Sequence, residues 1–86
     1  MPRKTVEWIH EPLREGRFRY TVHCALALVD RVVTDEDIRC AGRTAHTTRM
    51  QADGTWKVIG RGECDLEMTI VCRLLESREL ILVTVY

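Results

Sequence analysis

The chain lacks any excess of charge. Its 13 Lys and Arg residues are balanced by 13 Asp and Glu residues, so the formal net charge at pH 7 is zero. Proteins that bind nucleic acid through a general electrostatic attraction usually carry a surplus of Lys and Arg. The balance therefore counts against a nucleic-acid-binding function that depends on an overall positive field.

Long apolar runs are also missing. Charged residues and a histidine interrupt the segment that follows the first residues, and no later segment reaches the roughly 20 apolar residues of a membrane-spanning helix. We therefore expect a cytoplasmic protein with no signal peptide and no membrane association. Repeats and low-complexity tracts are absent, and 86 residues with 45% hydrophobic and 30% charged content predict a single domain over residues 1–86.

Closely spaced cysteine pairs of the Cys-x-x-Cys kind, which favour zinc, do not occur. The cysteines and histidines are instead spread along the chain, at Cys24, Cys40, Cys64, Cys72, His10, His23 and His46. In a reducing compartment such cysteines are expected to be free thiols that pack as small hydrophobic side chains. The sequence predicts no metal site and no cofactor.

The first half of the chain has helical periodicity. Apolar residues at helical spacing predict a first helix over residues 4–15, ended by Gly16, which can adopt the left-handed backbone of a helix end. Pro12 lacks a backbone donor and clashes with the preceding turn, so this helix would be kinked or would stop near His10. Charged and aromatic residues then alternate over residues 17–20, as in an edge strand with one buried face.

Two further helices are predicted from their capping residues. Thr21 is suited to cap a second helix, whose apolar residues recur three or four apart and form one stripe. These residues are Val22, Ala25, Leu26, Val29 and Val33. Thr34 can cap a third, short helix whose acidic first turn complements the positive helix end, and Gly42 would terminate it.

From residue 44 onward the periodicity changes to two, which is typical of strands. Strands are predicted over residues 45–50, 55–60, 66–74 and 80–86, with Asp53 and Gly54 forming a hairpin turn between the first two. The last strand is apolar on both faces, which indicates a central position. The predicted fold class is α+β, with two or three N-terminal helices packed on one face of an antiparallel sheet of about four strands.

His23 and Arg31 are the first candidates for chemistry. Both belong to the second predicted helix, roughly on one face and away from its apolar stripe. Metal-independent RNA cleavage needs a base for the 2′-hydroxyl proton, an acid for the leaving oxygen and cations that stabilise the phosphorane. Histidine and arginine can supply these groups. The alternative is that His23 only caps, packs or hydrogen-bonds at the start of its helix.

Lys57 and Arg61 share one face of a predicted strand and could hold a phosphate. Residues of the later strands would join them if those strands are adjacent and in suitable register, which the sequence leaves open. These residues are Arg73, Thr84 and Tyr86. The alternative is a solvated outer face of alternating charge. Trp56 and Tyr20 could stack on bases, but with so few aromatic side chains in the chain they are expected in the core.

Short matches spread over most of the chain point to a known family. They comprise residues 16–20, 34–38, 56–61 and 84–86, together with Thr21-x-His23 and Arg31. With these matches the chain resembles an uncharacterised bacterial family, domain of unknown function 4258, whose relatives look like small ribonuclease toxins of the RelE and BrnT type. The resemblance implies a RelE-like fold, and with it RNA cleavage or binding to a cognate antitoxin protein. The chain departs from the family at Ala27-Leu28, where relatives usually carry a polar pair, and in its acidic turn at residues 62–65.

Two functional hypotheses follow. In the first, the protein is a metal-independent endoribonuclease in which His23 is the general base or acid, Arg31 and Arg61 stabilise charge, and Tyr86 is a second proton-transfer group. The RNA phosphates would be bound by Lys57, Arg61, Arg73 and Thr84. In the second, the protein is a non-catalytic interaction domain that pairs through its sheet with another protein or with a second copy, as a homodimer.

Overall fold

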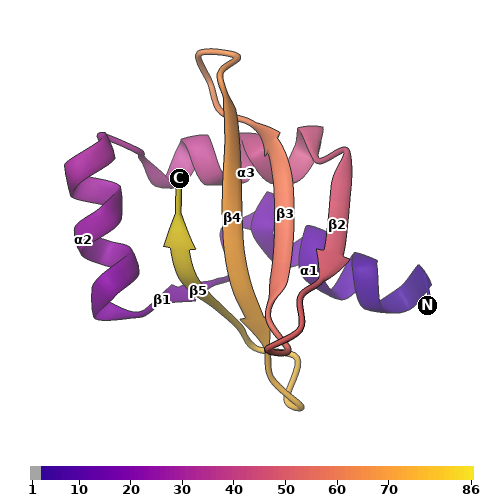
Figure 1. Ribbon diagram of the computed structural model, residues 1–86. Coiled ribbons are helices and arrows are strands. Elements are labelled where there is room, and N and C mark those ends of the chain that lie inside the picture. The colour runs from indigo at the N-terminus through magenta and orange to yellow at the C-terminus, as the bar shows by residue number, and fades with distance from the viewer. Residues whose placement is uncertain (1–2) are drawn as a thin grey trace.

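The computed structural model describes residues 3–86 and shows an α+β fold with three helices and a five-stranded sheet (Figure 1). The elements are α1 (Arg3–Glu15), β1 (Arg19–Tyr20), α2 (Val22–Arg31), α3 (Asp35–Thr44), β2 (Thr47–Met50), β3 (Trp56–Arg61), β4 (Glu67–Leu74) and β5 (Leu80–Val85). The predicted fold class is confirmed at this level. Within residues 3–86, none of the helices has the length and apolar character needed to cross a bilayer.

The sheet is mixed rather than purely antiparallel, with the strand order β1-β5-β4-β3-β2. Strands β2 to β5 form antiparallel pairs, whereas β1 pairs with β5 in parallel. The prediction of about four antiparallel strands was wrong on this point. The additional strand, β1, is the edge strand predicted from the alternation over residues 17–20, but it has only two residues, Arg19 and Tyr20, and both are exposed, so neither of them forms the predicted buried face. As predicted, β5 lies inside the sheet, between β1 and β4.

Helices α1 and α3 pack together on one face of the sheet, and the hydrophobic core lies between them and the strands (Figure 1). The fully buried side chains of this core include Ile9, Leu13, Ile38, Val58, Ile70, Leu80 and Leu82. Within residues 3–86, no helix lies over the opposite face. The fold therefore leaves one side of a twisted sheet available for contacts with other molecules.

Helix α1 continues through Pro12 to Glu15, although the proline predicted a kink or an earlier stop near His10. Burial of Ile9, Pro12 and Leu13 against the core holds this turn despite the missing backbone donor. The helix ends at Gly16, whose φ of 76° is the left-handed conformation predicted for it.

Gly42 does not terminate α3, which continues to Thr44. A Cβ atom at position 42 would lie 2.7 Å from the Cβ of Leu13, so the glycine is required for close packing of α3 against α1. The start of α3 agrees with the prediction. The Thr34 side chain accepts a hydrogen bond from the Asp37 backbone N–H, and the Asp37 carboxylate accepts one from the Thr34 N–H.

Helix α2 stands beside the sheet, next to β5, rather than over a face (Figure 1). It begins after Thr21, whose side chain accepts a hydrogen bond from the Cys24 N–H, as the predicted cap requires. Only Cys24 and Leu28 of this helix are buried. Three of the five residues of the predicted stripe face solvent, with exposed fractions of 78% for Val22, 66% for Leu26 and 79% for Val29, whereas Ala25 and Val33 are partly buried. Val32, which caps the helix and was not part of the prediction, is 83% exposed. We call the four exposed residues the α2 stripe.

Candidate functional site

A row of aligned residues crosses the uncovered face of the sheet, and all of them are polar or cationic except the buried Val71. The strand register aligns Arg49 of β2 with Lys57 of β3, Lys57 with Val71 of β4, and Val71 with Thr84 of β5. Aligned residues project from the same face of a sheet, and neighbouring strands lie about 4.8 Å apart. The row therefore extends roughly 14 Å across the open face and ends at β5, beside α2.

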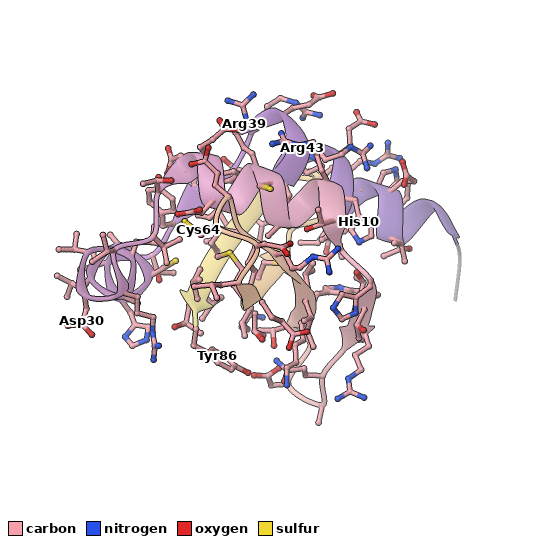
Figure 2. All side chains as sticks on the ribbon, turned by 90° about the horizontal axis from the view of Figure 1, so that it is seen from above. His10, Asp30, Arg39, Arg43, Cys64 and Tyr86 are labelled. Atoms are coloured by element: carbon pink, nitrogen blue, oxygen red, sulfur yellow. The ribbon has the colours of Figure 1, made fainter. Side chains whose placement is uncertain are left out.

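Tyr86 continues this face beyond the end of β5. Its backbone exchanges two hydrogen bonds with Thr69 of β4, of 2.7 and 2.9 Å, so the sheet pairing extends to this residue. Side chains two residues apart on a strand project to the same side. Tyr86 therefore lies on the open face next to Thr84, and Figure 2 shows Tyr86 and Asp30 on the side of the molecule opposite Arg43 of α3.

A groove of about 740 Å³ separates α2 from the end of β5. Its walls are His23, Leu26, Ala27, Val29, Asp30 and Arg31 from α2, and Thr84, Val85 and Tyr86 from the C-terminal strand. We call it the α2–β5 groove. Its apolar lining is formed by Leu26, Ala27, Val29 and Val85, and its polar groups are one imidazole, one carboxylate, one guanidinium and two hydroxyls. A groove with an apolar lining and a few convergent polar groups is typical of a binding site.

Hydrogen bonds from Thr21 hold the start of α2 against β5. The backbone N–H of Thr21 donates to the Leu82 carbonyl at 3.0 Å, and its hydroxyl donates to the Val83 carbonyl at 3.2 Å. Because α2 then rises along β5 (Figure 1), His23 lies near the lower end of the groove and Arg31 at the upper end, about 12 Å further along the helix axis. The cap thus sets which strand residues face which helix residues.

Several cations of the groove and the open face lack a carboxylate partner. Among the side chains that the structure describes, Arg31, Arg49 and Lys57 form no ion pair. By contrast, Arg61 forms an ion pair with Asp65 at 3.2 Å. The unpaired cations give the open face a local positive character although the chain as a whole is neutral.

The structure brings some of the predicted site residues together and separates others. The α2–β5 groove contains His23, Arg31, Thr84 and Tyr86. Lys57 lies on the same face, two strands away from Thr84. The remaining two lie at opposite ends of the face, since Arg61 is aligned with Glu67 near one end and Arg73 with Ile81 near the other.

Sequence reasoning missed Arg49 as a member of the row. A two-residue Asp53-Gly54 turn would have placed Lys57 opposite Met50, whereas the observed loop has three residues and places Lys57 opposite Arg49. The Gln51 N–H donates to the Thr55 carbonyl at 2.8 Å, and Gly54 takes the left-handed position with a φ of 88°. The glycine at the third loop position was the signal that could have predicted this register.

The two aromatic residues that were expected in the core have different environments. Trp56 is buried in the core, as predicted. Tyr20 is exposed, and its hydroxyl donates a hydrogen bond to the Asp35 carboxylate. That hydrogen bond is the main reason why the pKa of Tyr20 is raised to about 12, so its hydroxyl stays protonated at neutral pH. Tyr20 ties β1 to α3 and is not a member of the groove.

The cysteines are free thiols in every case, and Cys24 and Cys72 are buried. Burial raises the pKa of Cys72 to about 12, which makes this thiol unreactive in the folded protein. Among residues 3–86, no three His, Cys, Asp or Glu side chains come together in an arrangement that could hold a metal ion.

Comparisons with protein-family models, with curated proteins and with solved structures found no match to this chain.

Proposed function

We propose that the protein is a metal-independent endoribonuclease of the RelE-like toxin type, which binds RNA across the open sheet face and cleaves it in the α2–β5 groove. The observation that carries the proposal is the meeting of His23 and Arg31, from a helix near the start of the chain, with Thr84 and Tyr86 from its end. Side chains suited to proton transfer and to phosphate binding thus line a single groove.

The reaction that fits these groups is attack of a 2′-hydroxyl on the adjacent phosphorus. His23 accepts the 2′-hydroxyl proton, the 5′ oxygen leaves with a proton donated by Tyr86, and the products are a 2′,3′-cyclic phosphate and a 5′-hydroxyl end. Arg31 stabilises the additional negative charge of the phosphorane. A phosphate at the level of Thr84 would lie between His23 on one side and Arg31 with Tyr86 on the other.

The row on the open face supplies the RNA-binding part of the proposal. Arg49 and Lys57 are free of ion pairs among the described residues, and they lead across the sheet to Thr84. Phosphates bound along this row would position the strand so that the next phosphate enters the groove. As a toxin of this type, the protein would be held inactive by a cognate antitoxin.

The test is cleavage of labelled RNA by the purified protein in the presence of EDTA. We expect His23→Ala to lower the cleavage rate by about 100-fold or more, which is the usual effect of removing a general acid or base. His46→Ala is the matched control, because His46 is also exposed but lies outside the groove. Circular dichroism would verify that each variant is folded.

A second pair of variants tests the role of the Arg31 guanidinium. Arg31→Ala is expected to reduce cleavage strongly, whereas Arg43→Ala should leave it unchanged. Both arginines are exposed in the last turn of a helix, but Arg43 projects from the helical side of the molecule (Figure 2). The absence of cleavage by folded wild-type protein at high concentration, or equal losses in target and control variants, would refute the proposal.

The second candidate is a non-catalytic domain that pairs with another protein by strand addition. The observation that favours it is the position of β2, which forms one edge of the sheet and, within residues 3–86, pairs with β3 alone. The zero net charge agrees with this alternative. A folded protein that cleaves no RNA, but binds a partner less well when Thr48 is replaced by proline at this edge, would support it.

A further inference from the structure

The α2 stripe is an apolar surface that contributes nothing to the core of its own chain. Its four side chains are largely exposed, although Leu26 and Val29 also border the α2–β5 groove, and Figure 1 shows α2 as the outermost element on that side of the molecule. The apolar surface continues beyond the helix, because Val32 and the exposed Leu66 line a common depression. Single exposed apolar residues are common, but contiguous ones mark interaction surfaces.

Val32 adds a second, independent observation. It caps α2 in the left-handed conformation, with a φ of 55°, which is unfavourable for a β-branched residue and favourable for glycine. Its side chain is almost fully exposed, so no packing within the chain compensates for this strain. The position thus presents a methyl-bearing side chain to the outside at a conformational cost.

We propose that the α2 stripe is the contact surface of a symmetric homodimer, in which α2 packs antiparallel against α2 of a second copy. The charges beside the stripe carry this choice of partner. His23 and Asp30 lie on the same flank of the helix, where both line the groove, and they are seven residues or about 10.5 Å apart.

Two antiparallel copies of α2 are related by a two-fold axis perpendicular to both helices. This axis places the flanks with His23 and Asp30 of both copies on the same side of the contact, and the two flanks run in opposite directions. When Leu26 packs near the axis, His23 of one copy therefore faces Asp30 of the second copy, and the same pair forms again on the other side of the axis. A single surface thus supplies both halves of two charge-assisted hydrogen bonds. A purely acidic partner would leave Asp30 facing a like charge, and a purely basic partner would leave His23 without a carboxylate acceptor.

The same axis has a consequence for the open faces. Because the flank with His23 and Asp30 is on the side of the open face, the two sheets of the dimer would present their open faces in the same direction (Figure 2). A helix of ten residues is only about 15 Å long, so the contact is smaller than the roughly 800 Å² per partner of a standard interface unless Leu66 extends it. The dimer should therefore form in a concentration-dependent manner.

The experiment is sedimentation equilibrium of the wild-type protein over a wide concentration range. The expected result is a reversible monomer–dimer equilibrium that Leu26→Glu weakens by about 30-fold or more, since two glutamates would be placed at the centre of the contact. Met50→Glu is the control and should leave the equilibrium unchanged, because Met50 is an exposed apolar residue on β2, at the far edge of the sheet.

Two further sets of variants separate association from folding. His23→Asp and Asp30→His should each weaken the dimer, and the double variant should restore it, because the exchange regenerates both facing pairs. Val32→Gly should weaken the dimer without lowering the thermal midpoint of the monomer, since glycine relieves the left-handed cap. The proposal is overturned if the wild type stays monomeric at all concentrations, if Leu26→Glu dimerises normally, or if the double exchange fails to restore the dimer.

Discussion

Replacement of Gly60 by alanine tests the close contact between α3 and the sheet. Gly60 is buried in β3, and a Cβ atom at this position would overlap the Ala41 carbonyl oxygen and lie 3.0 Å from the Ala41 carbonyl carbon. These are backbone atoms of α3, so they cannot rotate away as a side chain would. The helix itself must move outward for the methyl group to fit.

Such a movement would disturb the hydrogen bonds that fix the end of α3. The Thr44 hydroxyl donates to the Arg61 carbonyl at 3.1 Å and accepts from the Arg61 N–H at 2.8 Å, next to Gly60 in the chain. Overpacking of a core typically costs about 1–3 kcal/mol, and strain on these hydrogen bonds adds about 1 kcal/mol. We therefore expect Gly60→Ala to lower the free energy of unfolding by about 2–4 kcal/mol.

That loss is a large part of the stability of a small domain, and it corresponds to a fall of about 10 to 25 °C in the thermal midpoint. Urea unfolding followed by circular dichroism would measure it, with an unchanged m-value as the sign of an intact two-state transition. Gly54→Ala is the control. Gly54 has a φ of 88° but no atom within 4 Å of an added Cβ, so only about 1 kcal/mol of backbone strain is expected there.

The reasoning would be refuted if Gly60→Ala changed the free energy of unfolding by less than about 0.5 kcal/mol, the range of ordinary surface substitutions. A cost no greater than that of Gly54→Ala would have the same meaning. Either result would imply that Ala41 and β3 are further apart than the structure has them, and that α3 covers the sheet less tightly.

Three further predictions concern pH, capping and thiol reactivity. Burial lowers the pKa of His10 below 6.5, so the stability that its neutral form contributes is fully present above pH 6.5 and is lost as the pH falls through the folded-state pKa. The urea concentration at the unfolding midpoint should therefore fall on acidification from neutral pH, and it should fall less in His10→Gln. Thr34→Ala should cost about 1 kcal/mol in urea unfolding, because the Asp37 N–H loses its capping acceptor, and an unchanged midpoint would contradict the capping box. A thiol reagent should modify the exposed Cys64 rapidly and Cys72 only at the rate of unfolding, and fast modification of Cys72 in folded protein would contradict its burial.

The elements that the sequence predicted well are those whose cause is local. Thr21 and Thr34 cap helices through hydrogen bonds to N–H groups three residues ahead, so a short window of sequence contains all of the interacting groups. The alternation along β4 likewise places Met68, Ile70 and Cys72 in the core, with Glu67 and Arg73 exposed on the other face. Gly42 misled the prediction, because a glycine that ends a helix and one that admits a neighbouring helix look the same in a sequence.

The orientation of α2 shows a second limit. The spacing of its apolar residues correctly predicted a helix with one apolar stripe. The spacing does not reveal which side of the helix packs against the sheet. Because α2 stands beside β5, its contacts with the sheet are narrow, and Cys24 and Leu28 fill them. Val22, Leu26 and Val29 are therefore left exposed to solvent.

The sequence by itself determined the class of fold, the positions of the caps and most strands, and the kinds of side chain available for chemistry, since these follow from interactions between near neighbours in the chain. Only the tertiary structure decided that His23 and Tyr86 share a groove, that Arg49 aligns with Lys57, and that Arg61 lies apart from both pairs. The physical reason is that strand order, register and the placement of α2 depend on packing between distant segments, and a shift of one residue in register reverses the face on which every side chain of a strand projects.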